Sequence, residues 1–267
     1  MSVHGYTFPT MGFLTDTVDG VRRRLERQPI DESGLMALAI RMPPPRGFAA
    51  RLWSAKAPAV IAEVKRSSPS AGRIADADPA ARARAYEEGG AAAVSVLTEP
   101  VHFDGSLADL RAVHHATTVP VLRKDFLVHP AQLIEARVVG ADAVLLIAAA
   151  LSETELKAML NAAEDLELGA LVETHSPEDL DRALGADAKV VGVNARDLES
   201  LEVDEDRALM LLRSVPDDRI AVFESGISTR KQVERAMEAG AKAVLVGEAL
   251  MRAEDPGAKL RELRGTA

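Results

Sequence analysis

Residues 140–150 read GADAVLLIAAA, a glycine-alanine pair followed by an apolar run of the kind that forms a buried strand. The same pair stands at Gly90-Ala91, Gly185-Ala186 and Gly240-Ala241, and each copy follows a helical pattern and precedes an apolar run. Glycine adopts the left-handed backbone that commonly ends a helix. Each pair is therefore typical of a helix C-terminus that leads into a strand.

Four further apolar runs, VIAEVKR, PVLRKDF, GALVETH and IAVFESGI, alternate with these units, so the chain carries eight candidate strands. Amphipathic stretches separate the strands, at residues 79–88, 106–116, 130–140, 152–167, 177–185, 203–215 and 229–240. Regular alternation of strand and helix is typical of a parallel sheet, and eight units predict an α/β fold of the closed (β/α)8 TIM-barrel type. A doubly wound sheet is the competing architecture, but it usually carries G-x-G-x-x-G after its first strand, and none stands there.

The residues before the first strand have a different pattern. Residues 13–27 and 31–40 show the apolar spacing of amphipathic helices, and three prolines at 43–45 end the second one. These helices carry too little apolar mass for a core of their own. We therefore expect a helical extension packed on the barrel over residues 1–58, and a barrel catalytic domain over residues 59–267.

Composition narrows the class of function. The chain has 267 residues, a formal net charge of -9 and no cysteine. The acidic balance argues against a nucleic-acid partner, and the absence of cysteine excludes disulfides and thiolate nucleophiles. Residues 1–20 lack the apolar core of a signal peptide, and no segment has the length and apolarity to span a bilayer. We expect a cytoplasmic protein without a membrane partner, and take a monomer as the working interpretation, since the sequence does not fix the oligomeric state.

Ionisable residues gather at the predicted strand ends. Glu63 and Lys65 stand two residues apart on one strand, so their side chains share a face. The other strand ends carry Arg123, Lys124, Asp125, Glu173, Asn194, Arg196, Glu224 and Ser225. Because a barrel places its active site at these ends, and because buried charges require partners, we expect the side chains to converge on one mouth. A structural ion pair remains the alternative for any one of them.

Glycines and hydroxyls predict an anion site at the same end. Residues 67–72 read SSPSAG, which suits a loop with free backbone N–H groups. The runs FESGI and LVGEA each place a glycine, Gly226 or Gly247, where the seventh or eighth strand ends. Loops after these two strands are the usual phosphate site of this fold. A role in tight turns alone is the alternative for both glycines. No histidine pair shows metal-ligand spacing, so we predict no metal site.

The chain resembles the indole-3-glycerol phosphate synthase family. The residues that carry the resemblance are IAEVKRSSPSAG (61–72), TEP..F.GSL.DL (98–110), PVLRKDF (120–126), EAR..GAD..LLI (135–147), ALVETH (170–175), VGVNARDL (191–198), ESGI (224–227) and LVGEALM (245–251). They span the whole predicted barrel. The resemblance implies a lyase of tryptophan biosynthesis that converts 1-(2-carboxyphenylamino)-1-deoxyribulose 5-phosphate to indole-3-glycerol phosphate, with loss of carbon dioxide and water.

The resemblance also implies roles for single residues. Lys124 would be the general acid, and Glu173 the general base of the dehydration, assisted by Glu63. Lys65 and Asn194 would hold the substrate carboxylate and hydroxyls. The implied substrate-binding residues are Ser68, Phe126, Leu145, Arg196, Glu224, Ser225, Gly226, Gly247 and Glu248, with Phe126 and Leu145 beside the aromatic ring and Glu224 on the sugar chain. Neither a cofactor nor a metal is implied, and the expected partner is a small phosphorylated substrate.

Two positions depart from the family pattern, and three rival functions stay open. Ala195 stands where many relatives have a second asparagine, and Glu248 where others have serine. A phosphoribosylanthranilate isomerase is the nearest rival, although such isomerases need a cysteine or an equivalent base, and this chain has no cysteine. The others are a Schiff-base aldolase that uses Lys124 or Lys65, and a non-catalytic barrel that binds phosphorylated metabolites.

Overall fold

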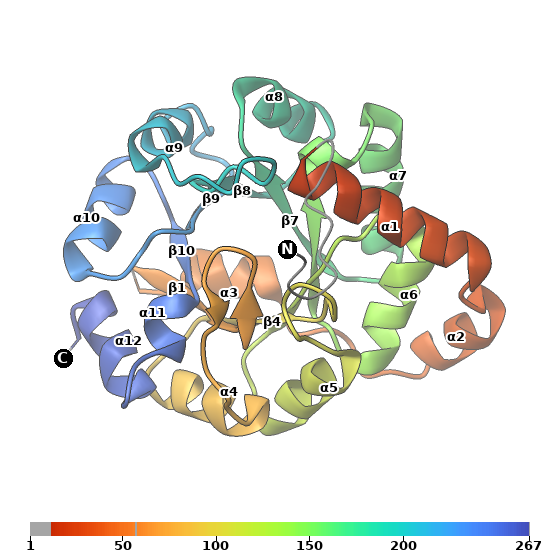
Figure 1. Ribbon diagram of the computed structural model, residues 1–267, viewed down its shortest axis with the longest axis horizontal. Coiled ribbons are helices and arrows are strands. Elements are labelled where there is room, and N and C mark those ends of the chain that lie inside the picture. The colour runs from red at the N-terminus through yellow and green to blue at the C-terminus, as the bar shows by residue number, and fades with distance from the viewer. Residues whose placement is uncertain (1–11, 57, 267) are drawn as a thin grey trace, which may run out of the picture.

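Eight parallel strands close into a barrel, and helices surround it as a ring (Figure 1). The computed structural model describes residues 12–56 and 58–266, so residues 1–11 and Ala57 of the predicted extension and Ala267 of the predicted barrel domain lie outside the described part. The strands are β1 (Ala59–Val64), β4 (Ala93–Leu97), β5 (Val121–Lys124), β6 (Ala143–Ile147), β7 (Gly169–Thr174), β8 (Val190–Asn194), β9 (Ile220–Glu224) and β10 (Ala243–Val246). The predicted fold class is confirmed, and each predicted run contains its strand except the first, where β1 begins one residue earlier, at Ala59.

The helices of the ring follow the strands in chain order. They are α4 (Pro79–Glu88), α5 (Leu107–Ala116), α6 (Pro130–Val139), α7 (Glu153–Asp165), α8 (Pro177–Gly185), α9 (Glu205–Leu212), α10 (Arg230–Glu238), α11 (Glu248–Met251) and α12 (Pro256–Arg264). Side chains cap several of their first turns, as Ser152 does with Glu155 in a capping box at α7. The 3-10 turn η1 (Ala148–Ala150) and the helices α11 and α12 were not expected, because their short or polar sequences show little periodicity.

All four glycine-alanine pairs stand at the end of a helix as predicted, and three of the four glycines have the left-handed backbone expected there. Gly90, Gly140 and Gly240 have φ angles of +88°, +98° and +106°. The expectation of a left-handed backbone is wrong at Gly185, which is the last residue of α8 and has no positive φ, whereas Asp187 takes the left-handed conformation with φ 62°. Aspartate tolerates this conformation because its short side chain can bond locally.

Three helices precede the barrel. α1 (Phe13–Arg27) and α2 (Glu32–Ala39) were predicted, while α3 (Phe48–Ser54) was not. In Figure 1, α1 lies beside α6 and α7, and an ion pair of 2.9 Å joins Arg22 of α1 to Glu155 of α7. Phe13 and Leu14 of α1 belong to the same apolar core as the barrel strands. α1 is thereby placed over the strand ends where the predicted site lies.

The short helix α3 closes the opposite end of the barrel. Phe48 and Leu52 are buried, and Phe48 packs against Gly169, the first residue of β7. A β-carbon at Gly169 would lie 3.0 Å from that of Phe48, so glycine lets α3 come close to the sheet. Among the described residues, no helix is long and apolar enough to cross a bilayer.

Candidate active site

Strand register shows which side chains share the barrel interior. Residues that pair directly across parallel strands face the same side, and successive residues of one strand alternate between sides. The paired residues include Leu97 with Lys124, Ile147 with Glu173, and Asn194 with Glu224. Lys124, Glu173 and Glu224 contact one another, so these pairs face the interior.

Two buried carboxyl groups flank the amino group of Lys124. Its Nζ lies 3.4 Å from Oε2 of Glu173 and 3.8 Å from Oε2 of Glu224. Both glutamates are almost completely buried, with exposed fractions of 0% and 1%. A second pair lies beside them, because Nζ of Lys65 is 2.9 Å from Oε1 of Glu63. The predicted convergence of acids and lysines on one mouth is therefore present for these side chains.

Burial and mutual charge decide the protonation of this cluster. Burial works to lower the pKa of Lys124, but the negative charges of Glu173, Glu224 and Glu63 outweigh it and raise that pKa. Burial likewise opposes ionisation of Glu173, yet the positive charge of Lys124 and the nearby imidazole of His175 lower its pKa. Glu224 has the opposite outcome, because burial and the charge of Glu173 raise its pKa well above the usual value. The surroundings thus favour the ammonium form of Lys124 and make Glu173 the more readily ionised of the two carboxyl groups beside it.

Two glycines make room for these acidic side chains. A β-carbon at Gly192 would lie 2.1 Å from Oε1 of Glu224, and one at Gly247 would lie 2.5 Å from Oε1 of Glu63. Such distances are far inside van der Waals contact. The structure thus shows a use for Gly247, space for the ion pair of Glu63 and Lys65, that differs from the predicted approach to a phosphate.

A cavity of about 310 Å³ opens at this end of the barrel. Most of the predicted site residues line it together: Glu63, Lys65, Ser68, Lys124, Asn194, Arg196, Glu224, Ser225, Gly226, Gly247 and Glu248. Asn194 is held by the backbone N–H of Arg196, which donates to its Oδ1 at 2.9 Å. The fully buried Glu173 reaches the cavity through its contact with Lys124. The structure therefore brings together side chains from six of the eight strands or their following loops.

The predicted anion loop is more ordered than expected. Residues Ser67–Ser68 and Gly72–Arg73 pair as a short antiparallel hairpin, β2 and β3. The hydroxyl of Ser68 accepts a hydrogen bond from the backbone N–H of Ala71 at 3.1 Å. On the opposite wall, Ser225 and Gly226 both have positive φ, 69° and 78°. The carboxylate of Glu248 turns to Arg252, whose Nε lies 2.8 Å from Oε1.

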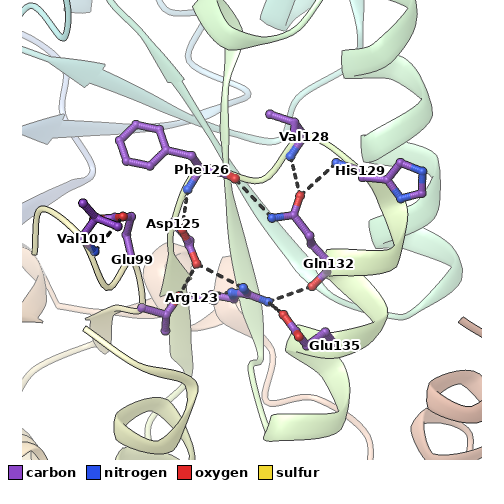
Figure 2. Close-up of polar contacts among 10 residues, drawn as sticks. Glu99, Val101, Arg123, Asp125, Phe126, Val128, His129, Gln132 and Glu135 are labelled. Carbon is purple, nitrogen blue, oxygen red and sulfur yellow. Dashed lines mark hydrogen bonds and ion pairs between the residues drawn. The ribbon is translucent and has the colours of Figure 1, made fainter. Parts of the chain in front are cut away.

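Arg123 and Asp125 do not face the mouth, so the expectation that they would is wrong. Arg123 precedes Lys124 on β5 and Asp125 follows the strand's last residue, and the alternation of side chains turns both to the outer side of the sheet. Nη1 of Arg123 lies 2.9 Å from Oε2 of Glu135 on α6, and Nη2 lies 3.1 Å from Oδ2 of Asp125 (Figure 2). The carboxylate of Asp125 also accepts from the backbone N–H of Phe126 at 2.8 Å. These contacts fasten the end of β5 to α6.

The predicted ring-binding residues take less direct positions. Phe126 and Leu145 are not among the described residues that line the cavity. Leu145 is buried on β6, paired with Leu171. Phe126 is buried next to two other rings, with centroids 6.1 Å from Phe13 and 6.4 Å from Phe103.

Sequence reasoning missed Phe13, Phe103 and His175. The rings of Phe13 on α1 and Phe103 after β4 line the cavity. Phe13 begins the expected helix at residues 13–27, but the sequence alone did not place that helix over the mouth. His175 follows β7, and its Nε2 lies 3.3 Å from Oε1 of Glu173. Its separation of two residues from Glu173 was an available signal, because such residues share a face.

Known proteins match the chain over almost its whole length. The family model described as indole-3-glycerol phosphate synthase matches residues 14–263. The chain belongs to this family. A relative from Micrococcus luteus named indole-3-glycerol phosphate synthase is 48% identical over 264 residues, which cover 96% of this chain and 98% of the relative. A relative of the same name from Mycobacterium avium is 49% identical over 253 residues, covering 94% and 93%.

Solved structures that are more distant in sequence share the fold. A 3-hexulose-6-phosphate synthase superposes with a TM-score of 0.64 at 19% identity, covering 78% of this chain and 99% of that one. A thiamine phosphate pyrophosphorylase from Pyrococcus furiosus gives a TM-score of 0.60 at 18% identity, covering 82% and 97%. Identities this low support the barrel fold alone, and the indole-3-glycerol phosphate synthase assignment comes from the family model and the sequence relatives.

Proposed function

We propose that this chain converts 1-(2-carboxyphenylamino)-1-deoxyribulose 5-phosphate to indole-3-glycerol phosphate, with release of carbon dioxide and water. The observation that carries the proposal is the ammonium of Lys124, held between Glu173 and Glu224 at the mouth of one cavity. Ring closure needs a carbonyl carbon made electrophilic by a proton, and a buried ammonium is a donor for that proton. Membership of the family supports the same reaction.

Lys124 acts as the general acid in this proposal. It protonates the ketone oxygen of the ribulose chain while the ring carbon that bears the carboxylate forms the new carbon-carbon bond. Loss of carbon dioxide then returns the electron pair of the broken bond to the ring. In the dehydration the hydroxyl leaves as water with a proton from Lys124, which has been reprotonated after ring closure, while Glu173, kept as a carboxylate by Lys124, takes the proton that the substrate carbon beside the nitrogen loses. Glu63 assists it from the neighbouring strand.

The remaining residues bind the two ends of the substrate. Lys65 and Asn194 hold the carboxylate and the hydroxyls, and the neutral carboxyl group of Glu224 can donate a hydrogen bond to the sugar chain. Ser68, Ser225, Gly226, Gly247 and Glu248 border the part of the cavity proposed for the phosphate, with Arg196 beside them. Binding at both ends holds the reacting carbons close together, which lowers the entropic cost of ring closure. Phe126 and Leu145 support the wall proposed for the aromatic ring.

A Schiff base on Lys124 is disfavoured by the charge of that lysine. A lysine that forms an imine must first lose its proton, which is why such lysines have lowered pKa values. The pKa of Lys124 is raised instead. No corresponding observation favours the isomerase or the binding-protein alternatives.

We also propose that the enzyme acts as a monomer in the cytoplasm and that the extension, residues 1–58, works with the barrel, residues 59–267, as one unit. Phe13 of the extension lines the cavity. Sedimentation of the purified chain with and without substrate tests the monomer.

The proposed function is tested by supplying the carboxyphenylamino substrate without added metal and following the fluorescence of the indole product. The unaltered chain is expected to form product, and Lys124→Ala to bind substrate with little loss of affinity but to turn it over at least about 100-fold more slowly, as expected for loss of a general acid. Absence of product with the unaltered chain would refute the proposed reaction. Loss of substrate affinity in Lys124→Ala without loss of turnover would refute the role of Lys124.

A further inference from the structure

His175 is a buried polar residue to which the proposed reaction gives no role. It follows β7 directly, two residues after Glu173, and only 8% of it is exposed. Its Nε2 lies 3.3 Å from Oε1 of Glu173, while the other carboxylate oxygen, Oε2, faces Lys124 at 3.4 Å. The two oxygens of Glu173 therefore contact two different partners.

We propose that His175 is a positioning residue for Glu173: it donates from Nε2 to Oε1, so that Oε2 stays directed at Lys124 and Glu173 remains the ionised member of the two carboxyl groups around that lysine. The inference rests on the proposed function, because it assigns a support to the proposed base. A carboxylate with one partner can rotate about its terminal torsion, which is broad. Partners on both oxygens fix its plane.

The backbone around His175 keeps the imidazole in place. The backbone N–H of His175 donates to Oδ2 of Asp179 at 3.0 Å, and its carbonyl accepts from Nη1 of Arg207 at 2.7 Å. Asp179 is itself fixed by Arg182, at 2.6 Å. Nδ1 of His175 is 4.0 Å from Asp179, which is too long for a hydrogen bond, so Nε2 is the ring nitrogen with an acceptor in reach.

Glu173 and Glu224 would otherwise be similar. Both are buried glutamates, both lie within 4 Å of Lys124, and each disfavours ionisation of the other. They differ in their second neighbour: Nε2 of His175 lies 3.3 Å from Oε1 of Glu173, whereas among the described residues Lys124 is the one basic side chain within 4 Å of Glu224. A donor on Glu173 alone selects which of the two carboxyl groups carries the charge.

The charged and titratable groups that face this pair come from several elements. Lys124 lies on β5, Glu224 on β9 and Glu63 on β1, all on the barrel interior. On the outer side are Asp179 and Arg182 on α8, Arg207 on α9, and Asp197 in the loop after β8, whose carboxylate interacts with His175. All of these groups stay in place in variants of His175, so the change in pH dependence is assigned to the lost donor.

The test compares His175→Leu, which removes the donor, with His175→Gln, which keeps an N–H donor but cannot titrate as histidine does. Turnover number, KM and the pH profile of kcat/KM are measured for both, with His115→Leu on the exposed face of α5 as the matched control. The wild-type chain is assayed first: absence of any turnover would refute the proposed function, and turnover gives the reference against which the two variants are compared.

For His175→Leu we expect kcat to fall about tenfold or more, KM to change less than about threefold, and the acid limb of the profile to move up by about one pH unit, the effect of losing one charge-assisted hydrogen bond. His175→Gln is expected to restore most of kcat and to return the limb towards its original place. An unmoved acid limb with kcat within about threefold of wild type would overturn the proposal. So would equal losses in His175→Leu and His175→Gln, since a role in packing alone predicts no rescue by the donor.

Discussion

Replacing Lys124 by methionine removes the ammonium that lies between Glu173 and Glu224. With Glu224 neutral, the charges of Lys65, Lys124, Glu63 and Glu173 cancel within the barrel mouth. Lys124→Met keeps a flexible side chain of similar length but leaves one negative charge without compensation. We expect this variant to lose both stability and activity.

The loss of stability follows from burial. Removing one partner of a buried ion pair costs about 3–5 kcal/mol, and since 17% of the Lys124 side chain is exposed we expect the lower end, about 3 kcal/mol. The double variant Lys124→Met/Glu173→Gln removes both charges and should recover about 2 kcal/mol of that loss. Turnover should fall by about 100- to 10,000-fold in Lys124→Met, the range for removal of a general acid.

Urea unfolding followed by circular dichroism at neutral pH measures the stability change, and product fluorescence measures turnover. Glu173→Gln alone completes the double-mutant cycle. If the double variant loses the sum of the two single losses, Lys124 and Glu173 do not interact in the folded protein. If Lys124→Met turns over substrate within tenfold of wild type, a different group supplies the proton.

Three further predictions follow from the same site. Glu224→Gln should lose less than about tenfold in kcat, because a neutral amide replaces a neutral carboxyl group, whereas Glu173→Gln should lose about 100-fold or more; equal losses in the two variants would contradict the assigned protonation states. The raised pKa of Lys124 contributes stability that is complete below lysine's unfolded pKa of about 10.4 and is lost as pH rises through the folded value. The lowered pKa of Glu173 contributes stability that is present above glutamate's unfolded pKa of about 4.3 and is lost as pH falls through the folded value. In thermal unfolding across pH, Lys124→Met/Glu173→Gln should therefore lose stability less steeply than wild type beyond each of these two limits. Gly192→Ala can keep its strand backbone, but its β-carbon overpacks the barrel interior and would displace Glu224, so the variant should lose about 1–3 kcal/mol of stability and also have a reduced kcat. Unchanged kinetics would show that the reaction does not depend on the position of Glu224.

The fold could be predicted because its signals are local and repeated. Each βα unit carries its own apolar strand, amphipathic helix and helix end, so eight separate patterns support one architecture. The elements that escaped prediction lack such a pattern. α3 has seven residues, which is too short for a clear periodic pattern. Its side chains Phe48 and Leu52 are buried because they cover the open end of the barrel, which the local sequence does not show.

The sequence predicted which residues belong to the site better than it predicted where their side chains point. Lys124 and Glu173 could be chosen from the sequence because ionisable groups at strand ends are expected at a barrel mouth. Arg123 and Asp125 were wrongly placed there. Because side chains alternate along a strand, the two neighbours of Lys124 must face the side opposite to Lys124. Phe13 could not be placed, because the path of α1 over the mouth depends on packing between distant parts of the chain.

The glycines of the interior show why the remaining chemistry needs coordinates. Read along the sequence, Gly192 is an interruption of a strand and Gly247 marks its end. In space each occupies the position where a β-carbon would meet the carboxyl group of another strand, Glu224 or Glu63. The acidic side chains can therefore lie at the level of Lys124 only because two neighbouring positions lack a side chain, and a pattern of residue types along one chain does not record that complementarity.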